Sequence, residues 1–213
     1  MKLLVGTRNP GKEHEISDIF AGLPFQVVFP SDQFLERLPE EADLERGVTF
    51  IENAVAKARY FAKRSGLATL GEDSGLEVDA LHGAPGVHSA RFATLYGPAE
   101  ARSGSETDPD AANNALLLER LGETPEAGRG ARYRCVVAFL ESPSASPQLV
   151  EATCEGRILT GPRGTGGFGY DPLFFSTDLG MTFGEAPLAT KQRVSHRGRA
   201  LRALIEVLLR RYT

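Results

Sequence analysis

The chain opens with KLLVGTRNPGKEHEISDIFAGLPFQVVF (residues 2–29), in which two short apolar runs flank a segment of helical periodicity. The runs at 2–5 and 26–29 predict strands, and the segment at 11–22 predicts a helix. The apolar residues that carry the helical spacing are Ile16, Ile19, Phe20 and Leu23. A strand, a helix and a second strand in succession are typical of α/β proteins. The opening stretch therefore predicts an α/β fold.

A second helix and a buried strand are expected further along the chain. The helix should begin at Thr49, because Thr49 and Glu52 form an S/T-x-x-E capping box ahead of an apolar stripe. It should end near Ser65–Gly66, where glycine is a common helix terminator. The apolar run at 67–70 then predicts a short buried strand.

The second half of the chain predicts a loop, a hairpin and a terminal helix. Residues 96–112 are rich in Gly, Ser, Asp and Pro, which indicates a surface loop before a short helix at 115–121. The β-rich runs at 132–140 and 149–154 flank SPSASPQ and predict a long hairpin. Apolar residues on one helical face predict a last helix at 195–211.

Composition narrows the class of protein. At 213 residues and 41% hydrophobic content, the chain is expected to form one domain or two closely joined lobes. A net charge of -4 argues against a protein that coats a nucleic acid polymer. No signal-peptide pattern and no apolar segment of roughly 20 residues is present, so we expect a soluble cytoplasmic protein without a membrane partner. Cys135 and Cys154 lack zinc-site spacing and are expected to be buried thiols.

An acidic cluster follows the strand expected at 67–70. Glu72, Asp73, Ser74 and Gly75 place two carboxylates and a hydroxyl in four positions. Carboxylate oxygens suit a hard cation such as Mg²⁺, which keeps several waters and is shared with substrate phosphates. The pattern therefore predicts a magnesium site and a triphosphate substrate.

The segment GTRNPGK (6–12) joins the first strand to the first helix. It has neither the G-x-x-x-x-G-K-[ST] spacing of P-loop NTPases nor the G-x-G-x-x-G of dinucleotide binders, which disfavours both classes. Thr7, Asn9, Gly11 and Lys12 offer polar groups and a cation ahead of a helix N-terminus, an arrangement that can seat a phosphate. An ordinary strand-to-helix turn has the same composition.

The segment GTGGFGYDP (164–172) is rich in glycine and carries two aromatic residues. Its backbone can approach a ligand closely, and Phe168 and Tyr170 are candidates to stack on a base. The alternative is a tight connection whose aromatic rings pack in the core. Asp171 is expected either to bind a base edge or to cap the turn before Pro172.

The segment KQRVSHRGRALRAL (191–204) places bases at the start of the expected last helix. His196, Arg197 and Arg199 oppose the helix dipole there, which is typical of an anion site. A solvated basic face is the alternative. An anion-binding Arg197 predicts that Arg197→Ala weakens nucleotide binding with little change in thermal stability. No role is assigned to His82 or His88.

Five motifs taken together resemble one family. They are TRNPGK, TFIENAVAKAR, EDSGLEVDALHGAPGVHSARFA, GTGGFGYDPLFF and SHRGRAL, in order and at suitable spacing between residue 3 and about residue 204. The chain resembles the inosine/xanthosine triphosphate pyrophosphatases, which remove noncanonical purine nucleotides. Each motif alone is a weak signal, whereas five in order are specific.

The resemblance implies both a fold and a reaction. The implied fold is a single α/β domain over residues 1–213, elongated, with a mixed central sheet flanked by helices and two lobes with the active-site cleft between them. The implied partner is a second copy in a homodimer. The implied reaction is Mg²⁺-dependent hydrolysis of ITP, dITP and XTP to the monophosphate and pyrophosphate, with selectivity arising from the 6-oxo group of the base.

The resemblance also implies site residues. Asp73 is similar to the catalytic residue that activates water and helps hold Mg²⁺. Glu45 and Glu72 resemble the other metal-site acids, although the segment around Glu45 matches loosely, and Glu41 or Asp43 is an alternative to it. The residues that resemble the nucleotide-binding set are Thr7, Arg8, Asn9, Pro10, Gly11, Lys12, Lys57, Ser74, Phe168, Gly169, Tyr170, Asp171, Lys191, His196 and Arg197.

Two other functions compete with this hypothesis. A nucleotide-binding regulatory module without turnover would keep the glycine-rich segment and the basic helix, but it would not need the acidic cluster. The second alternative is a pyrophosphatase of related fold that acts on other modified nucleotides, such as methylated pyrimidines, and product analysis across bases would distinguish it. The acidic pair Glu72–Asp73 favours an enzyme over the regulatory module.

Overall fold

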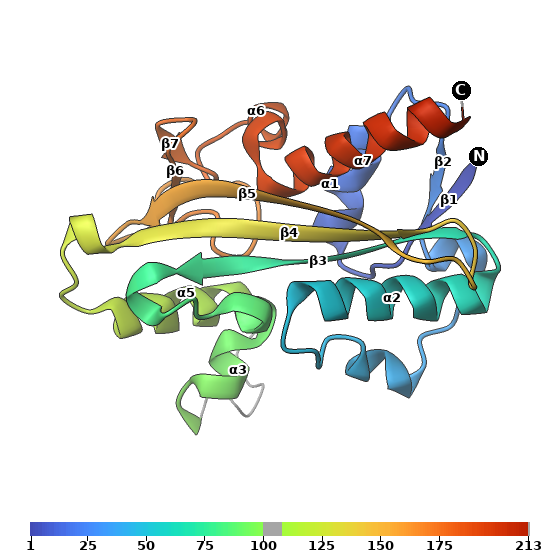
Figure 1. The fold of residues 1–213 in the computed structure, drawn as a ribbon. Helices are drawn as coiled ribbons and strands as arrows, with labels where there is room; N and C mark the ends of the chain where they lie inside the picture. The colour runs from blue at the N-terminus through green and yellow to red at the C-terminus, as the bar shows by residue number, and fades with distance from the viewer. Residues whose placement is uncertain (100–107, 213) are drawn as a thin grey trace. The chain divides into compact units, whose positions relative to one another are not determined.

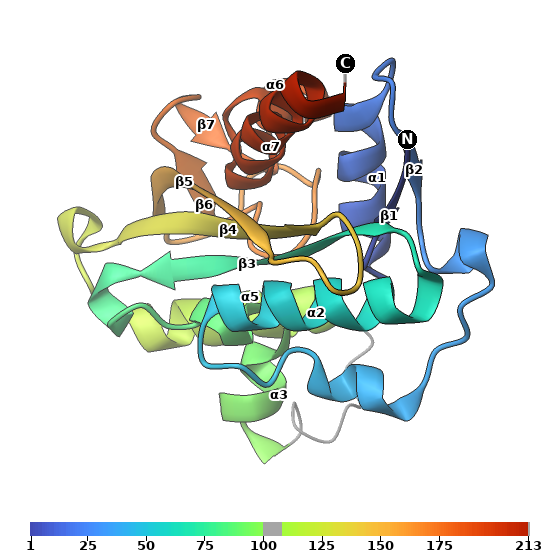
Figure 2. The same cartoon turned by 45° about the vertical axis from the view of Figure 1, so that its right-hand side comes forward.

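The computed structural model describes residues 1–99 and 108–212 (Figures 1 and 2). The chain divides into two compact units. Unit 1 comprises residues 1–74, 135–152 and 197–213, and unit 2 comprises residues 75–134 and 153–196. Among the described residues, none of the helices combines the length and the apolar character needed to cross a membrane. The prediction of a single domain over the whole chain stays a prediction.

The strands of the described residues form a mixed seven-stranded sheet in the order β2-β1-β3-β4-β5-β6-β7. The strands are β1 (Lys2–Val5), β2 (Gln26–Val28), β3 (Ala68–Val78), β4 (Gly130–Leu140), β5 (Gln148–Ile158), β6 (Phe174–Ser176) and β7 (Met181–Thr182). β1 pairs in parallel with β2 and β3, whereas β6 pairs antiparallel with β5 and β7. The predicted α/β class with a mixed sheet is confirmed.

Six α-helices are described alongside the sheet. They are α1 (Pro10–Phe20), α2 (Phe50–Ser65), α3 (Phe92–Tyr96), α5 (Pro109–Leu121), α6 (Leu188–Val194) and α7 (His196–Tyr212). Short 3₁₀ turns lie at Ser31–Gln33, Pro39–Asp43, Asp79–Leu81, Gly86–Arg91 and Glu126–Gly128.

The core of unit 1 follows from the alternation of side chains along β1. Leu3 and Val5 pack with α1 and α7, which lie side by side in both views (Figures 1 and 2). Leu4 points to the opposite face and packs with Phe61 of α2. Successive residues of a strand face opposite sides of a sheet, so the apolar residues Leu3, Leu4 and Val5 are covered by helices on both sides.

Helix α2 forms as the capping signals predict. Thr49 Oγ1 accepts a hydrogen bond from Glu52 N–H at 3.1 Å, while the Glu52 carboxylate accepts from Val48 N–H rather than from Thr49. Gly66 ends the helix in the left-handed region with φ 71°. Gly71 of β3 lets the helix approach closely, because a Cβ there would lie 2.2 Å from Ala54 O.

Unit 2 has a core of its own. Leu117 and Leu121 of α5 pack with Leu76 and Val78 of β3 and with aromatic residues of β4, β6 and the segment after β7. Tyr133 contacts Phe174 edge to face at 4.7 Å and stacks on Phe183 at 5.9 Å. Tyr170 and Leu173 of the glycine-rich connection between β5 and β6 belong to the same cluster, so the connection is anchored on this aromatic core.

Three predictions of local structure need correction. The strand predicted at 67–70 continues to Val78 as β3, so the acidic cluster lies inside the strand and not after it. Helix α5 begins at Pro109, whereas a loop was predicted up to residue 112; the rest of that loop, residues 100–107, lies outside the described residues. The sequence signals that mark the start of α5, and that the prediction missed, are an N-cap at Asp108 and a proline at the first helical position. Helix α6 and the short strands β6 and β7 were not predicted, since short elements carry little periodicity.

Candidate active site

Glu72 and Asp73 follow each other in β3 but face different helices of unit 1. Asp73 faces α2, where its carboxylate accepts hydrogen bonds from Asn53 Nδ2 at 3.0 Å and from Lys57 Nζ at 2.7 Å. Asn53 and Lys57 are four residues apart and therefore share one face of the helix. Both donors are buried, so they fix the orientation of the Asp73 side chain.

A second carboxylate converges on the same lysine. Glu45 accepts from Lys57 Nζ at 2.8 Å. Burial lowers the pKa of Lys57, but the carboxylates of Asp73 and Glu45 outweigh it and raise the pKa above its ordinary value. Two carboxylates against one ammonium leave one negative charge. This group, which we call the Lys57 group (Glu45, Asn53, Lys57 and Asp73), has the oxygen ligands and the charge that suit a hard cation.

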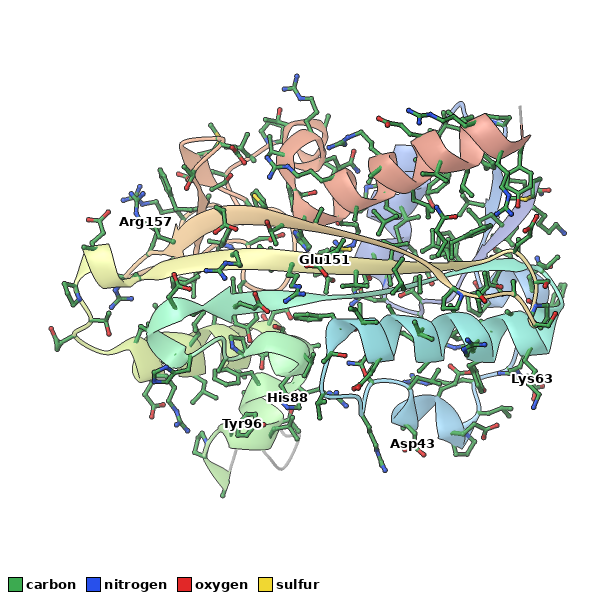
Figure 3. All side chains as sticks on the ribbon, viewed as in Figure 1. Asp43, Lys63, His88, Tyr96, Glu151 and Arg157 are labelled. Carbon is green, nitrogen blue, oxygen red and sulfur yellow. The ribbon has the colours of Figure 1, made fainter. Side chains whose placement is uncertain are left out.

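The two alternatives to Glu45 have other partners. Glu41 accepts from Arg8 at 2.6 and 2.9 Å and from Arg64 at 3.1 Å. Burial raises the pKa of Glu41, but the hydrogen bond from Arg8 and the other donors lower it overall. Asp43 pairs at the surface with Arg46 at 3.0 Å (Figure 3). Glu45, rather than Glu41 or Asp43, therefore shares Lys57 with Asp73.

Glu72 belongs to a separate buried group on the other face of β3. Its carboxylate lies 2.7 Å from Lys12 Nζ and accepts from Arg197 at 3.2 Å and from the Cys135 thiol at 3.3 Å. Arg197 also donates to Glu15 and, at 2.9 Å, to Ser74 Oγ. We call this set the Arg197 group (Lys12, Glu15, Glu72 and Arg197).

Charges within the Arg197 group balance, with two carboxylates against two cations. Burial raises the pKa of Glu72, yet Arg197, Lys12 and Lys57 together hold that pKa well below its usual range. Burial lowers the pKa of Arg197, and Glu72 and Glu15 raise it overall. Both side chains are almost inaccessible, with exposures of 0% for Glu72 and 3% for Arg197. Of the basic residues at the helix start, Arg197 thus has Glu72 and Glu15 as its anionic partners, and nucleotide binding by this helix start stays a prediction.

The three predicted metal ligands are therefore not gathered in one place. Asp73 and Glu45 converge on Lys57, whereas Glu72 is held by the Arg197 group. Across residues 1–99 and 108–212, no group of three or more His, Cys, Asp or Glu side chains is arranged to hold a metal ion. A metal at the Lys57 group would thus have two protein carboxylates and would need its other ligands from water or substrate.

The segment 6–12 forms the turn and the N-terminus of α1. Asn9 caps the helix by accepting from Lys12 N–H at 3.1 Å, and Thr7 Oγ1 accepts from Asn9 N–H at 3.2 Å. Asn9 and Pro10 are exposed. Lys12 lies in the same turn, and its ammonium pairs with Glu72. The segment combines an accessible helix N-terminus with a cation, as the phosphate-binding prediction requires.

In unit 2, Asp171 organises the glycine-rich segment. Its carboxylate accepts from Phe168 N–H at 2.9 Å and from Lys191 Nζ at 2.6 Å. The Lys191 ammonium lies 5.1 Å from the centre of the half-buried Phe168 ring, within the range of a cation–π contact. A Cβ on Gly167 would lie 2.0 Å from the Asp171 carboxylate, so glycine is required there.

Two other predicted nucleotide-binding residues, one from this segment and one from the start of α7, are buried in unit 2. Tyr170 is buried, and its hydroxyl donates to Ser89 O at 2.9 Å; burial raises its pKa. His196 is also buried and stacks on Tyr133 at 4.6 Å. The alternative interpretation, an aromatic ring packed in the core, holds for Tyr170 but not for the half-buried Phe168.

Several residues near the Lys57 group and the Arg197 group were not predicted to belong to the site. Asn53 and Glu15 carry hydrogen bonds to Asp73 and Arg197, and each lies one helical turn from a predicted residue, Lys57 or Lys12. That spacing was the available signal. His88, which was given no role, contacts the ring of Tyr96 at 5.6 Å in unit 2 (Figure 3). Both cysteines are buried, as predicted.

Comparison with known proteins gives concordant matches over nearly the whole chain. A model described as the Ham1 family matches residues 3–207. A dITP/XTP pyrophosphatase of Geobacter sulfurreducens is 47% identical over 204 residues, which cover 95% of this chain and 94% of that protein. A dITP/XTP pyrophosphatase of Thermus thermophilus is 45% identical over 206 residues, which cover 97% of this chain and 91% of that protein.

Solved structures agree with these matches. A HAM1 protein from Coxiella burnetii is similar with a TM-score of 0.82 and 33% identity, and the match covers 99% of both chains. A nucleoside-triphosphatase/dITP/XTP pyrophosphatase from Mycobacterium abscessus is similar with a TM-score of 0.69 and 41% identity, and the match covers 96% of this chain and 98% of that one.

Proposed function

The chain belongs to the Ham1 family, and from that premise we propose that it hydrolyses noncanonical purine nucleoside triphosphates such as dITP, XTP and ITP to the monophosphate and pyrophosphate. Relatives named dITP/XTP pyrophosphatase support the substrate class. The observation that carries the proposal is Asp73, a buried carboxylate held by Lys57 and Asn53 in a group with excess negative charge.

Asp73 is proposed as the general base that accepts a proton from the attacking water. A base must be oriented toward the proton that it removes, and its efficiency depends on that geometry. Lys57 bonds Asp73 Oδ1 and Asn53 bonds Asp73 Oδ2. These two bonds set the orientation of the carboxylate before substrate binds, and each oxygen keeps a second acceptor site for a water molecule or a metal ion.

Mg²⁺ is proposed as the cofactor, held by the carboxylates of Asp73 and Glu45. Both carboxylates accept from the Lys57 ammonium, at 2.8 and 2.7 Å, so they lie near each other, and their charge exceeds that of Lys57 by one, which suits a metal ion bound beside the lysine. When bound, Mg²⁺ would withdraw electron density from a phosphoryl oxygen and lower the pKa of a bound water. Glu72 is left out of this set because Lys12 and Arg197 neutralise it.

Phosphate and base are proposed to contact different segments. The N-terminus of α1 and the Lys12 ammonium offset phosphate charge, and Glu72 holds Lys12 in place. Phe168 is proposed to stack on the base, since its ring is half-buried and braced by Lys191. Ser74, whose hydroxyl accepts a hydrogen bond from Arg197, is proposed as a further nucleotide-binding residue of unit 1.

A homodimer and a cytoplasmic location are proposed from the family resemblance alone. Analytical ultracentrifugation of the purified chain tests the first, because monomer and dimer differ twofold in mass. Fractionation of cells that express the tagged chain tests the second.

The proposed reaction is tested by a steady-state assay with Mg²⁺ that compares dITP, XTP, ITP, dATP, dGTP and 5-methyl-dCTP and identifies the phosphate product. Pyrophosphate released chiefly from dITP, XTP and ITP is the expected result. Orthophosphate as the product, or binding without turnover, would contradict it, and turnover chiefly of the methylated pyrimidine would change the substrate class.

A further inference from the structure

We infer that Asp110 and Asn114 of α5 are positioning residues that hold the nucleotide-contacting segment 168–171 through the backbone of Gly169. Neither residue belongs to any of the sequence motifs, and both lie outside the Lys57 and Arg197 groups. The inference deepens the proposed function, because it rests on Phe168 stacking on the substrate base.

Gly169 is bonded to α5 through both of its backbone groups. Its N–H donates to Asp110 Oδ2 at 2.6 Å, and its carbonyl accepts from Asn114 Nδ2 at 2.9 Å. Asp110 and Asn114 are four residues apart, so they extend from one face of the helix on consecutive turns. The Asp110 carboxylate is the acceptor and the Asn114 amide is the donor, so together they pair with Gly169 as the backbone of a neighbouring strand would.

The backbone of Gly169 needs such support. Its φ is 63°, in the left-handed region, and it lies between two residues with different tasks. Phe168 presents a half-buried ring, and Tyr170 packs in the core with its hydroxyl on Ser89 O. The clamp from α5 therefore fixes the turn that leads from the core-packed Tyr170 to the ring of Phe168.

The bonds of Asp171 do not replace this clamp. The Asp171 carboxylate accepts from Phe168 N–H, which closes the turn, and from Lys191 of α6. These bonds hold the two ends of the segment, whereas Asp110 and Asn114 hold Gly169 between them on α5. Since a ligand-contacting ring must be held within a fraction of an ångström, loss of the clamp should weaken substrate binding more than the chemical step.

The test compares Asp110→Ala with Asp110→Asn. Both remove the charge near the start of α5, but the amide oxygen of Asn can still accept from Gly169 N–H. We expect Asp110→Ala to raise KM for dITP roughly tenfold, with kcat changed less than about twofold, because one hydrogen bond that holds the base-contacting segment is lost while the reacting groups are unchanged. Asp110→Asn should restore most of the affinity. Glu119→Ala, an exposed change on the same helix, is the control.

Asn114→Ala provides a second measure of the clamp. It should also raise KM, and the double variant with Asp110→Ala should raise KM by less than the product of the single effects, because both residues act on one glycine. An unchanged KM in folded Asp110→Ala and Asn114→Ala would overturn the inference. Equal effects of Asp110→Ala and Asp110→Asn would also overturn it, since they would assign the effect to charge.

Hydrogen exchange separates failure of the clamp from failure of the proposed function. Amide exchange in a peptide that covers residues 164–171 should be faster in Asp110→Ala than in the wild type or in Asp110→Asn, whether or not dITP is the substrate. Wild-type protein that does not turn over dITP would overturn the proposed function, and unchanged exchange in Asp110→Ala would overturn the clamp.

Discussion

Glu72 and Asp73 are consecutive residues of β3, yet their carboxylates lie on opposite faces of the strand. Asp73 accepts a hydrogen bond from Lys57 at 2.7 Å, and Glu72 lies 2.7 Å from the Lys12 ammonium. The period of two along a strand forces this separation. It places an excess of negative charge on the Asp73 side and leaves the Glu72 side neutral. The two acids that look like one motif therefore have different physical tasks.

Replacing Asp73 should remove turnover and leave the fold in place. Asp73→Asn keeps the size and a hydrogen-bond acceptor for Lys57 but loses the proton-accepting charge, so kcat for dITP should fall at least about 100-fold. Pyrophosphate release and the thermal midpoint are the measurements. Asp79→Asn, which alters an exposed carboxylate next to Arg132, is the matched control and should keep wild-type activity. A folded Asp73→Asn variant with near-normal kcat would refute the assigned role.

Replacing Glu45 should weaken metal binding specifically. Glu45→Gln removes one of the two carboxylates that converge on Lys57, so the Mg²⁺ concentration for half-maximal activity should rise roughly tenfold. Mn²⁺ binding followed by electron paramagnetic resonance gives a second reading without turnover.

The control for this metal prediction lies two residues away. Asp43→Asn removes an acidic residue that pairs with Arg46 at the surface, so it should leave the Mg²⁺ dependence unchanged. A shift of equal size in both variants would indicate a general effect of surface charge and would remove Glu45 from the metal site.

Local signals explain which parts of the fold the sequence could predict. Helix α2 was predicted from Thr49 to Gly66 because its cap, its apolar stripe and its terminating glycine lie within the element itself. The continuation of β3 through Glu72 to Gly75 was missed because the polar residues there are paired with residues far away in the chain. Strand propensity does not register a partner such as Arg197, which lies 125 residues from Glu72.

The same limit applies to the site. Asp73 and Lys57 were identified individually, but their direct bond depends on the packing of α2 against β3. Arg197 was expected to face a ligand, and the structure buries it among Glu15, Glu72 and Ser74. Arg197→Ala is therefore expected to lower stability as well as binding, because it leaves a buried carboxylate without its main partner. The predicted absence of a stability effect is revised for that reason.

The contribution of Glu72 to the free energy of unfolding should be lost at low pH. The pKa of Glu72 in the folded protein is held well below the ordinary value of about 4.3, so its stabilising effect is present above that value and is lost as the pH falls below it. Glu72→Gln should cost about 3 kcal/mol or more at pH 7, because Arg197 and Lys12 lose their shared carboxylate.

Urea unfolding of the wild type and Glu72→Gln between pH 3 and pH 7 measures this difference. The gap between the two proteins should narrow steadily below about pH 4, since the wild-type carboxylate then becomes protonated on unfolding. Acids that do not contact Arg197 or Lys12 titrate equally in both proteins and cancel in the comparison. A gap of constant size across the whole range would show that Glu72 does not titrate in this way.

Gly71 should control the distance between α2 and β3. A Cβ at this position would lie 2.2 Å from Ala54 O and 2.5 Å from Ala58 N, and both atoms are helix backbone that cannot rotate away. Gly71→Ala should therefore push the helix outward, lower the free energy of unfolding by about 1–3 kcal/mol and reduce kcat, because Asn53 and Lys57 move away from Asp73. Gly161→Ala, whose Cβ would meet nothing within 4 Å, is the control for the general effect of replacing a glycine. If Gly71→Ala lost stability while keeping full kcat, the position of α2 would not determine the geometry of Asp73.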